Sequence, residues 1–316
     1  MKKLLYALSL LLVSYLALVV YIAHDLSAPS RRPVMPYHQS WLLSPADHGI
    51  QITSRTHEGL PYLIVEAAGV APAKRGSLLR DQVKNRDLPL TTFGTHHQHL
   101  VLYHGRKGRK EDLLPIAERY AAIGYRCLVP DMPGHGDHPS QRSYFGTSDS
   151  HLQTLISMIE SEERTMNFPT RAVLWGMSMG GSFACQSVAH SPDTFSAVII
   201  VNSFDTLSHV VDHKCASYGL GPLLSTPVKL CSRWIYRFDL SLADSVECMT
   251  NASLPLLVAH GTEDKLIPLP LGRRLYESST ARHKQWISVE EAHHTNVLVT
   301  AHPLHADTAE FLIRSQ

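Results

Sequence analysis

A serine enclosed by glycines is the first feature of this sequence that could do chemistry. Residues 176–180 read Gly-Met-Ser-Met-Gly and follow the apolar run 171–175, while residues 181–190 are compatible with a helix. Glycines on both sides of a serine allow a sharp strand-to-helix turn, because no side chain obstructs the backbone. The pattern predicts a nucleophile elbow with Ser178 as the nucleophile. The alternative is a glycine-rich turn that carries an ordinary surface serine.

A serine hydroxyl is a weak nucleophile at neutral pH, so it needs a histidine to accept its proton and a carboxylate to orient that histidine. Two later segments offer these groups. Residues 260–264 (His-Gly-Thr-Glu-Asp) follow the apolar run 254–259, and residues 290–294 (Glu-Glu-Ala-His-His) follow the run 285–289. We expect Asp264 as the acid, with Glu263 as its competitor, and one of the adjacent pair His293 and His294 as the base.

The developing oxyanion needs two backbone N–H donors, one from the residue after the nucleophile and one from the loop after the first parallel strand. These positions correspond to Met179 and Arg106. We expect His104 to shape that loop without titrating. Asp131 and His135 also lie at a strand end, but they precede the serine in the chain and are expected to be structural.

The elements that must position these residues alternate between strands and helices, which predicts an α/β fold with a mostly parallel, doubly wound sheet flanked by helices. An antiparallel hairpin over residues 51–66 precedes this sheet. Helices are expected at 111–123, 148–162 and 181–190, and a polar loop or short helix at 74–87. Parallel strands are expected at residues 100–103, 126–129, 171–175, 197–201, 254–259 and 285–289.

Taken together, the motifs at 104–105, 131–136, 176–180, 260–264 and 292–294 resemble those of the α/β-hydrolase superfamily, and more narrowly its membrane-anchored branch of BEM46-like and prolyl-oligopeptidase-like serine hydrolases. The resemblance covers roughly residues 50–315. It implies His294 as the base, because family members commonly carry glycine where this chain has His293. A second departure is Arg106, at a position that often holds Asn or Gly.

The N-terminal segment predicts a membrane anchor. Lys2 and Lys3 precede an uncharged run over residues 4–23, about the length that crosses a bilayer as a helix. The run is long for a signal peptide and lacks a small-x-small cleavage site, so we expect residues 1–23 to be an uncleaved signal anchor. The sequence leaves open which side of the membrane the domain faces. Four prolines within residues 24–48 predict an extended linker.

The remaining residues, 49–316, are expected to form one hydrolase domain with a short cap at about 204–249. The cap contains many apolar residues together with Lys214, Lys229, Arg233 and Arg237. Its apolar residues are expected to pack onto the core. The functional alternative is an apolar channel for an acyl chain, with the basic residues binding a headgroup or carboxylate.

Composition excludes some classes of partner. The 29 Lys and Arg residues balance 28 Asp and Glu residues, which argues against a nucleic-acid binder. The histidines at 96, 97 and 99 lack further ligands at metal spacing, so no metal site is expected. Among the five cysteines, Cys215 and Cys231 could form a disulfide in an oxidising compartment.

These observations predict a membrane-anchored serine hydrolase that cleaves an ester or thioester of a small or acylated substrate through Ser178, His294 and Asp264. Acyl transfer of this kind requires no metal or organic cofactor. A serine peptidase of the prolyl-oligopeptidase-like type is the alternative within the enzyme class. A non-catalytic hydrolase fold that serves as a binding module is the alternative from another class. The oligomeric state is left open by the sequence.

Overall fold

The central element of the protein is one eight-stranded sheet. It is seen in a computed structural model that describes residues 1–166 and 170–315. The strand order is β1-β2-β4-β3-β5-β6-β7-β8; β1 and β2 are antiparallel to their neighbours, and β3 to β8 run parallel. The strands are β1 (Ile50–His57), β2 (Leu60–Ala67), β3 (Gln98–Tyr103), β4 (Tyr125–Pro130), β5 (Ala172–Met177), β6 (Phe195–Val201), β7 (Leu256–Gly261) and β8 (Lys284–Val289).

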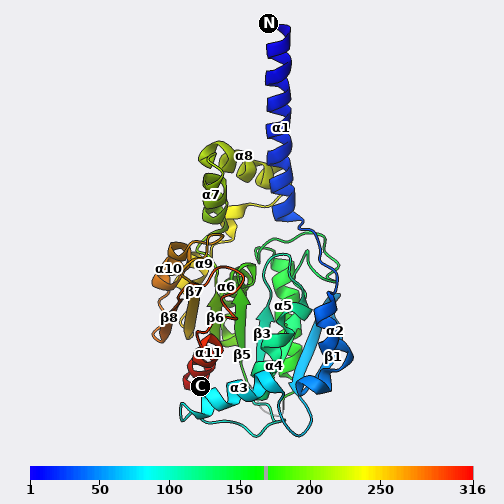
Figure 1. The fold of residues 1–316 in the computed structure, drawn as a ribbon, viewed down its shortest axis with the longest axis vertical. Helices are drawn as coiled ribbons and strands as arrows, with labels where there is room; N and C mark the ends of the chain where they lie inside the picture. Colours follow the sequence, from blue (N-terminus) through cyan, green and yellow to red (C-terminus); the bar gives the residue numbers. More distant parts are fainter. Residues whose placement is uncertain (167–169, 316) are drawn as a thin grey trace.

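Both faces of this sheet are covered by helices (Figure 1). The central strands are apolar at consecutive positions, as parallel strands buried on both sides require. Val101 and Tyr103 of β3 join one apolar cluster, whereas Leu100 and Leu102 join the other. The first cluster includes residues of α5 (Asp149–Glu163), α6 (Met179–His190), α9 (Ser245–Thr250) and α10 (Leu269–Ser278), and the second includes residues of α3 (Lys74–Lys84), α4 (Leu114–Ala122) and α11 (Leu304–Arg314). The predicted doubly wound sheet flanked by helices is confirmed.

The strand order reverses direction at β3, which pairs with β4 on one side and with β5 on the other. Open α/β sheets bind ligands beyond the carboxyl ends of the strands at such a switch point, because the two following connections diverge to opposite faces. The two connections that begin here carry the loop after Tyr103 and the turn around Ser178. The topology therefore brings the two predicted oxyanion segments side by side.

Several local boundaries follow the sequence signals. The helix predicted over 111–123 consists of the 3-10 turn η2 (Lys110–Leu113) followed by α4, and it ends before Gly124. Gly124 has φ +101°, and a Cβ there would lie 2.4 Å from the Thr91 hydroxyl oxygen, so only glycine fits this turn. Shorter 3-10 turns are η1 (Pro45–His48), η3 (Pro192–Thr194) and η4 (Leu240–Leu242).

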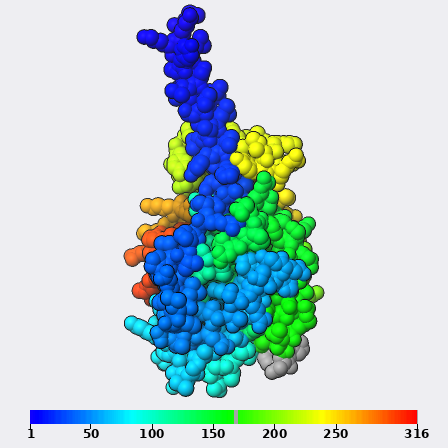
Figure 2. Space-filling view, turned by 90° about the vertical axis from the view of Figure 1, so that its right-hand side faces the viewer, coloured from blue at the N-terminus to red at the C-terminus, as the bar shows by residue number. Residues whose placement is uncertain are grey.

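The N-terminal helix α1 (Lys2–Ser27) extends beyond the sheet layers and contacts a helical pair formed by α7 (Leu207–Ser217) and α8 (Gly221–Trp234) (Figure 1). Val19 and Ala23 of α1 are buried in the same apolar cluster as Leu224 and Val228 of α8. The first half of α1 stands clear of the molecule (Figure 2). Among the described residues, α1 is the one helix whose length and apolar composition suffice to cross a membrane.

The segment between α1 and the sheet differs from an extended linker. It contains the helix α2 (Pro36–Leu43), which begins at a proline and buries His38 and Trp41. The Trp41 indole N–H donates to Glu118 on α4 at 3.2 Å. Proline at the first position of a helix is favourable, because that residue's N–H would be unpaired in any case. The prolines that predicted an extended chain therefore include one that starts a packed helix.

Candidate active site

Ser178 lies at a turn that the neighbouring glycines permit. It connects β5 to α6 and has φ 56° and ψ −121°, a backbone conformation that non-glycine residues rarely adopt. A Cβ at Gly176 would lie 2.2 Å from the Gly180 carbonyl oxygen, and a Cβ at Gly180 would lie 2.1 Å from the Tyr103 carbonyl oxygen. Both glycines are therefore required by close backbone packing rather than by positive φ.

The strained turn is held by hydrogen bonds on both sides of the serine. The Ser178 N–H donates to the Val201 carbonyl at 2.9 Å, and the Ser203 hydroxyl donates to the Ser178 carbonyl at 2.8 Å. The serine is 8% exposed, and it lines the pocket described below. These contacts fix the hydroxyl at the end of β5.

The structure brings Ser178, His294 and Asp264 together in one chain of hydrogen bonds. His294 Nδ1 lies 2.7 Å from Asp264 Oδ2, and His294 Nε2 lies 3.1 Å from Ser178 Oγ. Since Nδ1–H donates to the carboxylate, the Nε2 lone pair faces the serine hydroxyl. This is the arrangement in which a histidine can accept the serine proton.

The carboxylate of Asp264 is itself oriented by backbone donors. Its Oδ1 accepts hydrogen bonds from the N–H groups of Leu266 and Ile267, both at 2.9 Å. The side chain is fully buried. The predicted competitor Glu263 is instead exposed to solvent and lies outside the hydrogen-bond chain. His293 is also exposed, and its ring contacts the Thr295 hydroxyl at 3.2 Å.

Asn202 joins the loops that carry these groups, and the sequence did not single it out. Its side-chain oxygen accepts from the Gly261 N–H at 2.8 Å, and its side-chain N–H donates to the His294 carbonyl at 3.2 Å. The residue is fully buried and has φ 45°. The sequence signal that could have identified Asn202 is its position directly after the apolar strand predicted at 197–201.

The two predicted oxyanion donors, Met179 and Arg106, lie directly after Ser178 and in the loop after β3. Met179 is the first residue of α6, so its N–H has no partner within the helix. A Cβ at Gly105, the residue before Arg106, would lie 3.5 Å from the Ser178 Cβ, which shows how closely the loop approaches the serine. The Arg106 side chain forms an ion pair with Asp25 of α1.

His104 holds the loop in place. Its Nε2 accepts from the Met132 N–H at 3.1 Å, and its Nδ1 lies 2.8 Å from the Gly105 carbonyl oxygen, to which it donates. Both ring nitrogens are occupied in the neutral form, and burial lowers the pKa of His104 further. The imidazole is therefore a fixed spacer beside the oxyanion loop.

Asp131 and His135 are not part of the hydrogen-bond chain that joins Ser178, His294 and Asp264. The buried Asp131 carboxylate accepts from the Lys110 N–H at 2.8 Å and from the Lys110 ammonium at 2.6 Å. His135 donates from Nδ1 to the Pro133 carbonyl at 2.9 Å, and burial lowers the pKa of its imidazole to about 3. Both residues stabilise the turns around the site, as the sequence led us to expect.

A pocket of about 610 Å³ opens over Ser178 and His294. Its walls are largely apolar and come from three parts of the chain that are distant in sequence. One wall is α1, which contributes Tyr21, Ile22, Asp25 and Leu26. The opposite wall comes from the predicted cap and nearby loops and contains Phe145, Phe204, Leu207, Val210, Val211, Lys214, Cys215, Tyr218, Leu266 and Ile267.

Some cap residues line the pocket, and others pack onto the rest of the protein. Leu207, Val210 and Val211 line the pocket, whereas Leu224 is buried against α1. Of the basic residues, Lys229 pairs with Asp212 and Arg233 with Asp239. Lys214 lines the pocket. Cys215 and Cys231 are both free thiols.

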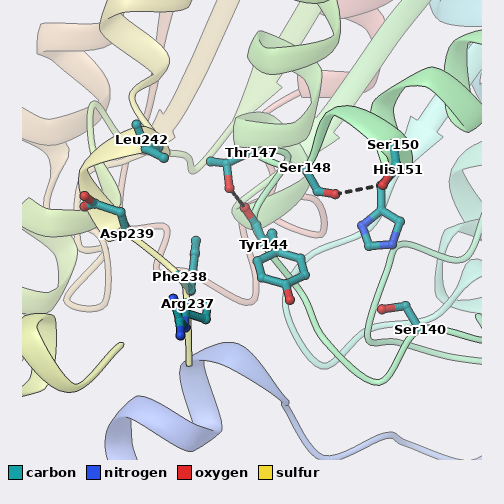
Figure 3. A pocket seen from close by; sticks show the side chains of 10 residues that line it. All are labelled: Ser140, Tyr144, Thr147, Ser148, Ser150, His151, Arg237, Phe238, Asp239 and Leu242. Carbon is teal, nitrogen blue, oxygen red and sulfur yellow. Dashed lines mark hydrogen bonds between the residues drawn. The ribbon is translucent and has the colours of Figure 1, made fainter. Parts of the chain in front are cut away.

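A separate pocket of about 500 Å³ lies where the start of α5 meets the chain after α8 (Figure 3). Tyr144, His151 and Asp239 line it, and the Thr147 hydroxyl donates to the Tyr144 carbonyl at 2.8 Å. None of the predicted catalytic residues lies there. Ser178 and His294 instead line the pocket of about 610 Å³ described above.

The sheet order, the serine elbow and the hydrogen-bond chain define the class: this is an α/β-hydrolase fold. The family model described as serine aminopeptidase, S33, matches residues 94–226. Protein bem46 of Schizosaccharomyces pombe is 26% identical over 202 residues, which are 62% of this chain and 61% of that protein. The lysophosphatidylserine lipase ABHD12 of Danio rerio is 23% identical over 214 residues, covering 62% of this chain and 51% of the lipase.

The fold is shared with solved structures. An esterase of Pyrococcus furiosus superposes with a TM-score of 0.63 at 16% identity, over 90% of this chain and 96% of the esterase. The matches in sequence span about half to three fifths of the length of the two curated relatives. The chain has the α/β-hydrolase fold, and its sequence is similar to a hydrolase family model and to a BEM46 protein.

Proposed function

We propose that this protein is a membrane-anchored serine hydrolase that cleaves esters or thioesters of acylated molecules. The observation that carries the proposal is the chain Ser178–His294–Asp264, with distances of 3.1 Å and 2.7 Å, at the floor of a largely apolar pocket. The similar proteins include a lipase and an esterase, which supports ester chemistry.

In the proposed reaction, Ser178 Oγ attacks the carbonyl carbon of the ester while His294 Nε2 accepts the hydroxyl proton. Asp264 stabilises the resulting imidazolium and holds its orientation. The N–H groups of Met179 and Arg106 donate to the oxygen that becomes negative, and the N-terminus of α6 adds its dipole. His294 then returns the proton to the leaving alcohol or thiol, and water cleaves the acyl-enzyme by the reverse sequence.

The apolar pocket supports an acyl group as the part of the substrate that stays on the enzyme. Its volume of about 610 Å³ lies in the range of ligand-sized cavities, and most of its wall residues are apolar. Of its charged lining residues, Asp25 pairs with Arg106 and Lys107. A short acetyl group would leave most of this surface without contact. Activity should therefore rise with acyl length, by roughly fourfold for each added methylene that becomes buried.

In this proposal, residues 1–23 anchor the protein in the membrane and residues 24–48 connect the anchor to the catalytic unit. The catalytic unit comprises residues 49–316, with a cap at 204–249. Support comes from α1, whose N-terminal half is apolar and exposed. Further support comes from α8 beside it, which exposes Leu223, Leu230 and Trp234. Exposed apolar residues on two adjacent helices fit a lipid surface.

The test is labelling of the full chain with a fluorophosphonate probe, followed by hydrolysis of p-nitrophenyl esters of increasing acyl length. We expect labelling of the parent protein and none of Ser178→Ala. Cys215→Ala is a matched control from the same pocket, because it also removes one polarizable atom while leaving the hydrogen-bond chain intact. Labelling that persists in Ser178→Ala refutes the mechanism, because another nucleophile then reacts with the probe. Labelling that is absent from the parent also refutes it and favours the non-catalytic binding module.

Peptidase activity is the second candidate, because the matching family model is described as a serine aminopeptidase. The same serine chemistry cleaves amides, and the leaving group would then be an amine. Aminoacyl p-nitroanilides measured beside the esters decide between the two. An anilide hydrolysed with a higher kcat/KM than every ester would replace the esterase proposal.

A further inference from the structure

A second cavity adjoins the pocket over Ser178. It has a volume of about 740 Å³ and shares Gly105, Arg106, Lys107, Met177 and Thr295 with that pocket. Met177 directly precedes the candidate nucleophile, and Thr295 directly follows the candidate base. A substrate bound at the serine can therefore extend into both cavities at once.

The walls of this second cavity carry an excess of positive charge. Three carboxylates, Asp25, Asp112 and Glu118, pair with some of its basic groups. The carboxylates are shared with other partners, since Asp112 also contacts His38 and Glu118 also contacts His48. The cationic side chains that line the cavity are Arg31, Arg32, Arg75, Arg106, Lys107 and Arg119.

Two of these guanidinium groups have carbonyl partners in place of carboxylates. Within residues 1–166 and 170–315, Arg31 donates to the carbonyls of Gly136 and Ser140, and Arg119 donates to the Pro115 carbonyl at 2.6 Å. No ion pair with a carboxylate is found for either arginine in those ranges. Burial, with the nearby charge of Arg75, lowers the pKa of Arg119, as expected for a cation whose charge is incompletely balanced.

Two more arginines have donors that are buried without a partner. The Nε atoms of Arg32 and Arg106 are inaccessible to water and make no hydrogen bond in the part of the chain that the structure describes. Buried donors are normally paired, so these two Nε atoms show that the hydrogen-bonding capacity of both guanidinium groups is not fully used. A phosphate group offers several anionic acceptor oxygens and is the anion that arginine side chains bind most specifically.

We propose that this cavity binds a phosphate group on the alcohol portion of the substrate, so that the protein acts on acyl esters of phosphorylated alcohols. The inference rests on the proposed esterase function. The acyl chain occupies the apolar pocket under α7, and the leaving alcohol, which receives its proton from His294, extends past Thr295 into the basic cavity. The basic residues of the cap take no part in this role, because none of them lines the basic cavity, and Lys229 and Arg233 already have carboxylate partners.

The experiment compares two esters that differ only in the phosphate, 1-decanoylglycerol 3-phosphate and 1-decanoylglycerol, with the full chain in a neutral detergent. We expect kcat/KM to be roughly tenfold or more higher for the phosphorylated ester, since hydrogen bonds to a charged group contribute this much. Arg119→Gln and Arg31→Gln should each reduce that preference by about fivefold or more. Arg119→Lys, which keeps the charge, should restore part of it.

Arg273→Gln is the matched control. Arg273 is an exposed arginine on α10 that pairs with Glu277 and does not line the cavity, so its substitution should leave the preference at the value of the parent. Fluorophosphonate labelling of every variant reports whether the serine site has formed. The preference is a ratio of two substrates on the same protein sample, so partial misfolding of a variant does not change it.

Equal kcat/KM for the two esters, or a preference that both arginine variants retain, overturns the phosphate site while leaving the esterase proposal intact. Absence of labelling and of hydrolysis of either ester overturns the proposed function instead. Inorganic phosphate provides a further arm. Inhibition of 1-decanoylglycerol hydrolysis by millimolar phosphate, without any preference for the phosphorylated ester, would make the cavity a site for free anions and would also refute the proposal.

Discussion

At the scale of single residues, Ser178 has a strained backbone conformation that hydrogen bonds hold in place. A non-glycine residue with φ 56° and ψ −121° costs on the order of 1–3 kcal/mol. The hydrogen bonds to Val201 and from Ser203 hold the serine in this conformation. An ordinary surface serine has no reason to be held in this way, so the strain supports a functional role for the turn.

The adjacent histidines give the sharpest test at this scale. We expect His294→Ala to lower kcat on the order of 10⁴-fold, because the proton acceptor of the serine is lost. His293→Ala should keep kcat within about threefold, since its ring contacts only Thr295 at the surface. Steady-state kinetics with a p-nitrophenyl ester measures both. Comparable losses in the two variants would contradict the geometry proposed for the base.

At the scale of elements, α1 is joined to the loop that carries the proposed oxyanion donor. Asp25 of α1 accepts from the guanidinium of Arg106 and lies 3.1 Å from the ammonium of Lys107. The same helix forms one wall of the pocket through Tyr21, Ile22 and Leu26. A segment that would serve as an anchor therefore also positions part of the site.

Asp25→Ala should lower kcat by up to about tenfold with a smaller change in KM, because small displacements of a catalytic donor reduce the rate steeply. Asp47→Ala is a suitable control, since Asp47 is an exposed carboxylate in the same N-terminal region. Steady-state kinetics on a short, neutral p-nitrophenyl ester separates the two constants. Unchanged kcat in Asp25→Ala would show that the loop holds its position without α1.

Helix α5 is connected to the sheet through a buried ion network around Glu162. Its carboxylate accepts from Tyr62 at 2.6 Å and from Arg126 at 2.7 Å, and it pairs with Arg55 at 3.0 Å. Burial alone would raise the pKa of Glu162, but these hydrogen bonds and the charges of Arg126 and Arg55 outweigh it, so the pKa lies below the ordinary 4.5. The sequence pattern predicted the apolar face of this helix but gave no sign of the network.

Because the pKa of Glu162 is lower in the folded state, its stabilising effect is complete above the unfolded value of about 4.3 and is lost as the pH falls through the folded value. Glu162→Gln should lower the free energy of unfolding by about 3 kcal/mol at pH 7. The difference from the parent should shrink below about pH 4.

Urea unfolding across this pH range measures the effect, with Glu160→Gln on the exposed face of the same helix as the control. A difference that stays constant down to pH 3 would mean that the charge of Glu162 does not contribute.

At the scale of the whole molecule, α1 and α8 lie at one end of the protein, beyond the sheet and its flanking helices (Figures 1 and 2). Both helices expose large apolar side chains. Val19 and Ala23 are buried in the cluster that includes α8, so loss of α1 would expose part of the core. A signal peptide that is removed after export is not expected to fill the core of the mature protein. The packing therefore supports an anchor that is retained.

We expect the intact mass of the purified protein to include residues 1–27, and we expect the protein to resist extraction from membranes by carbonate. Val19→Glu should destabilise the cap by about 3 kcal/mol, because it places an unpaired charge among apolar side chains. Val70→Glu, at an exposed valine outside the proposed anchor, controls for the added charge. Recovery of a soluble chain that lacks the first 27 residues would refute the anchor.

The sequence by itself determined the order of strands and helices, the turn at Ser178 and the candidate acid and base, because these depend on local spacing and on strand ends that meet at one edge of a parallel sheet. Only the tertiary structure decided which groups meet across that edge. Asn202 links two loops, Asp25 reaches Arg106, and the basic cavity collects arginines from the N-terminal segment, α3, the oxyanion loop and α4. No local pattern relates these positions, since their contacts arise from the packing of elements that are distant in sequence.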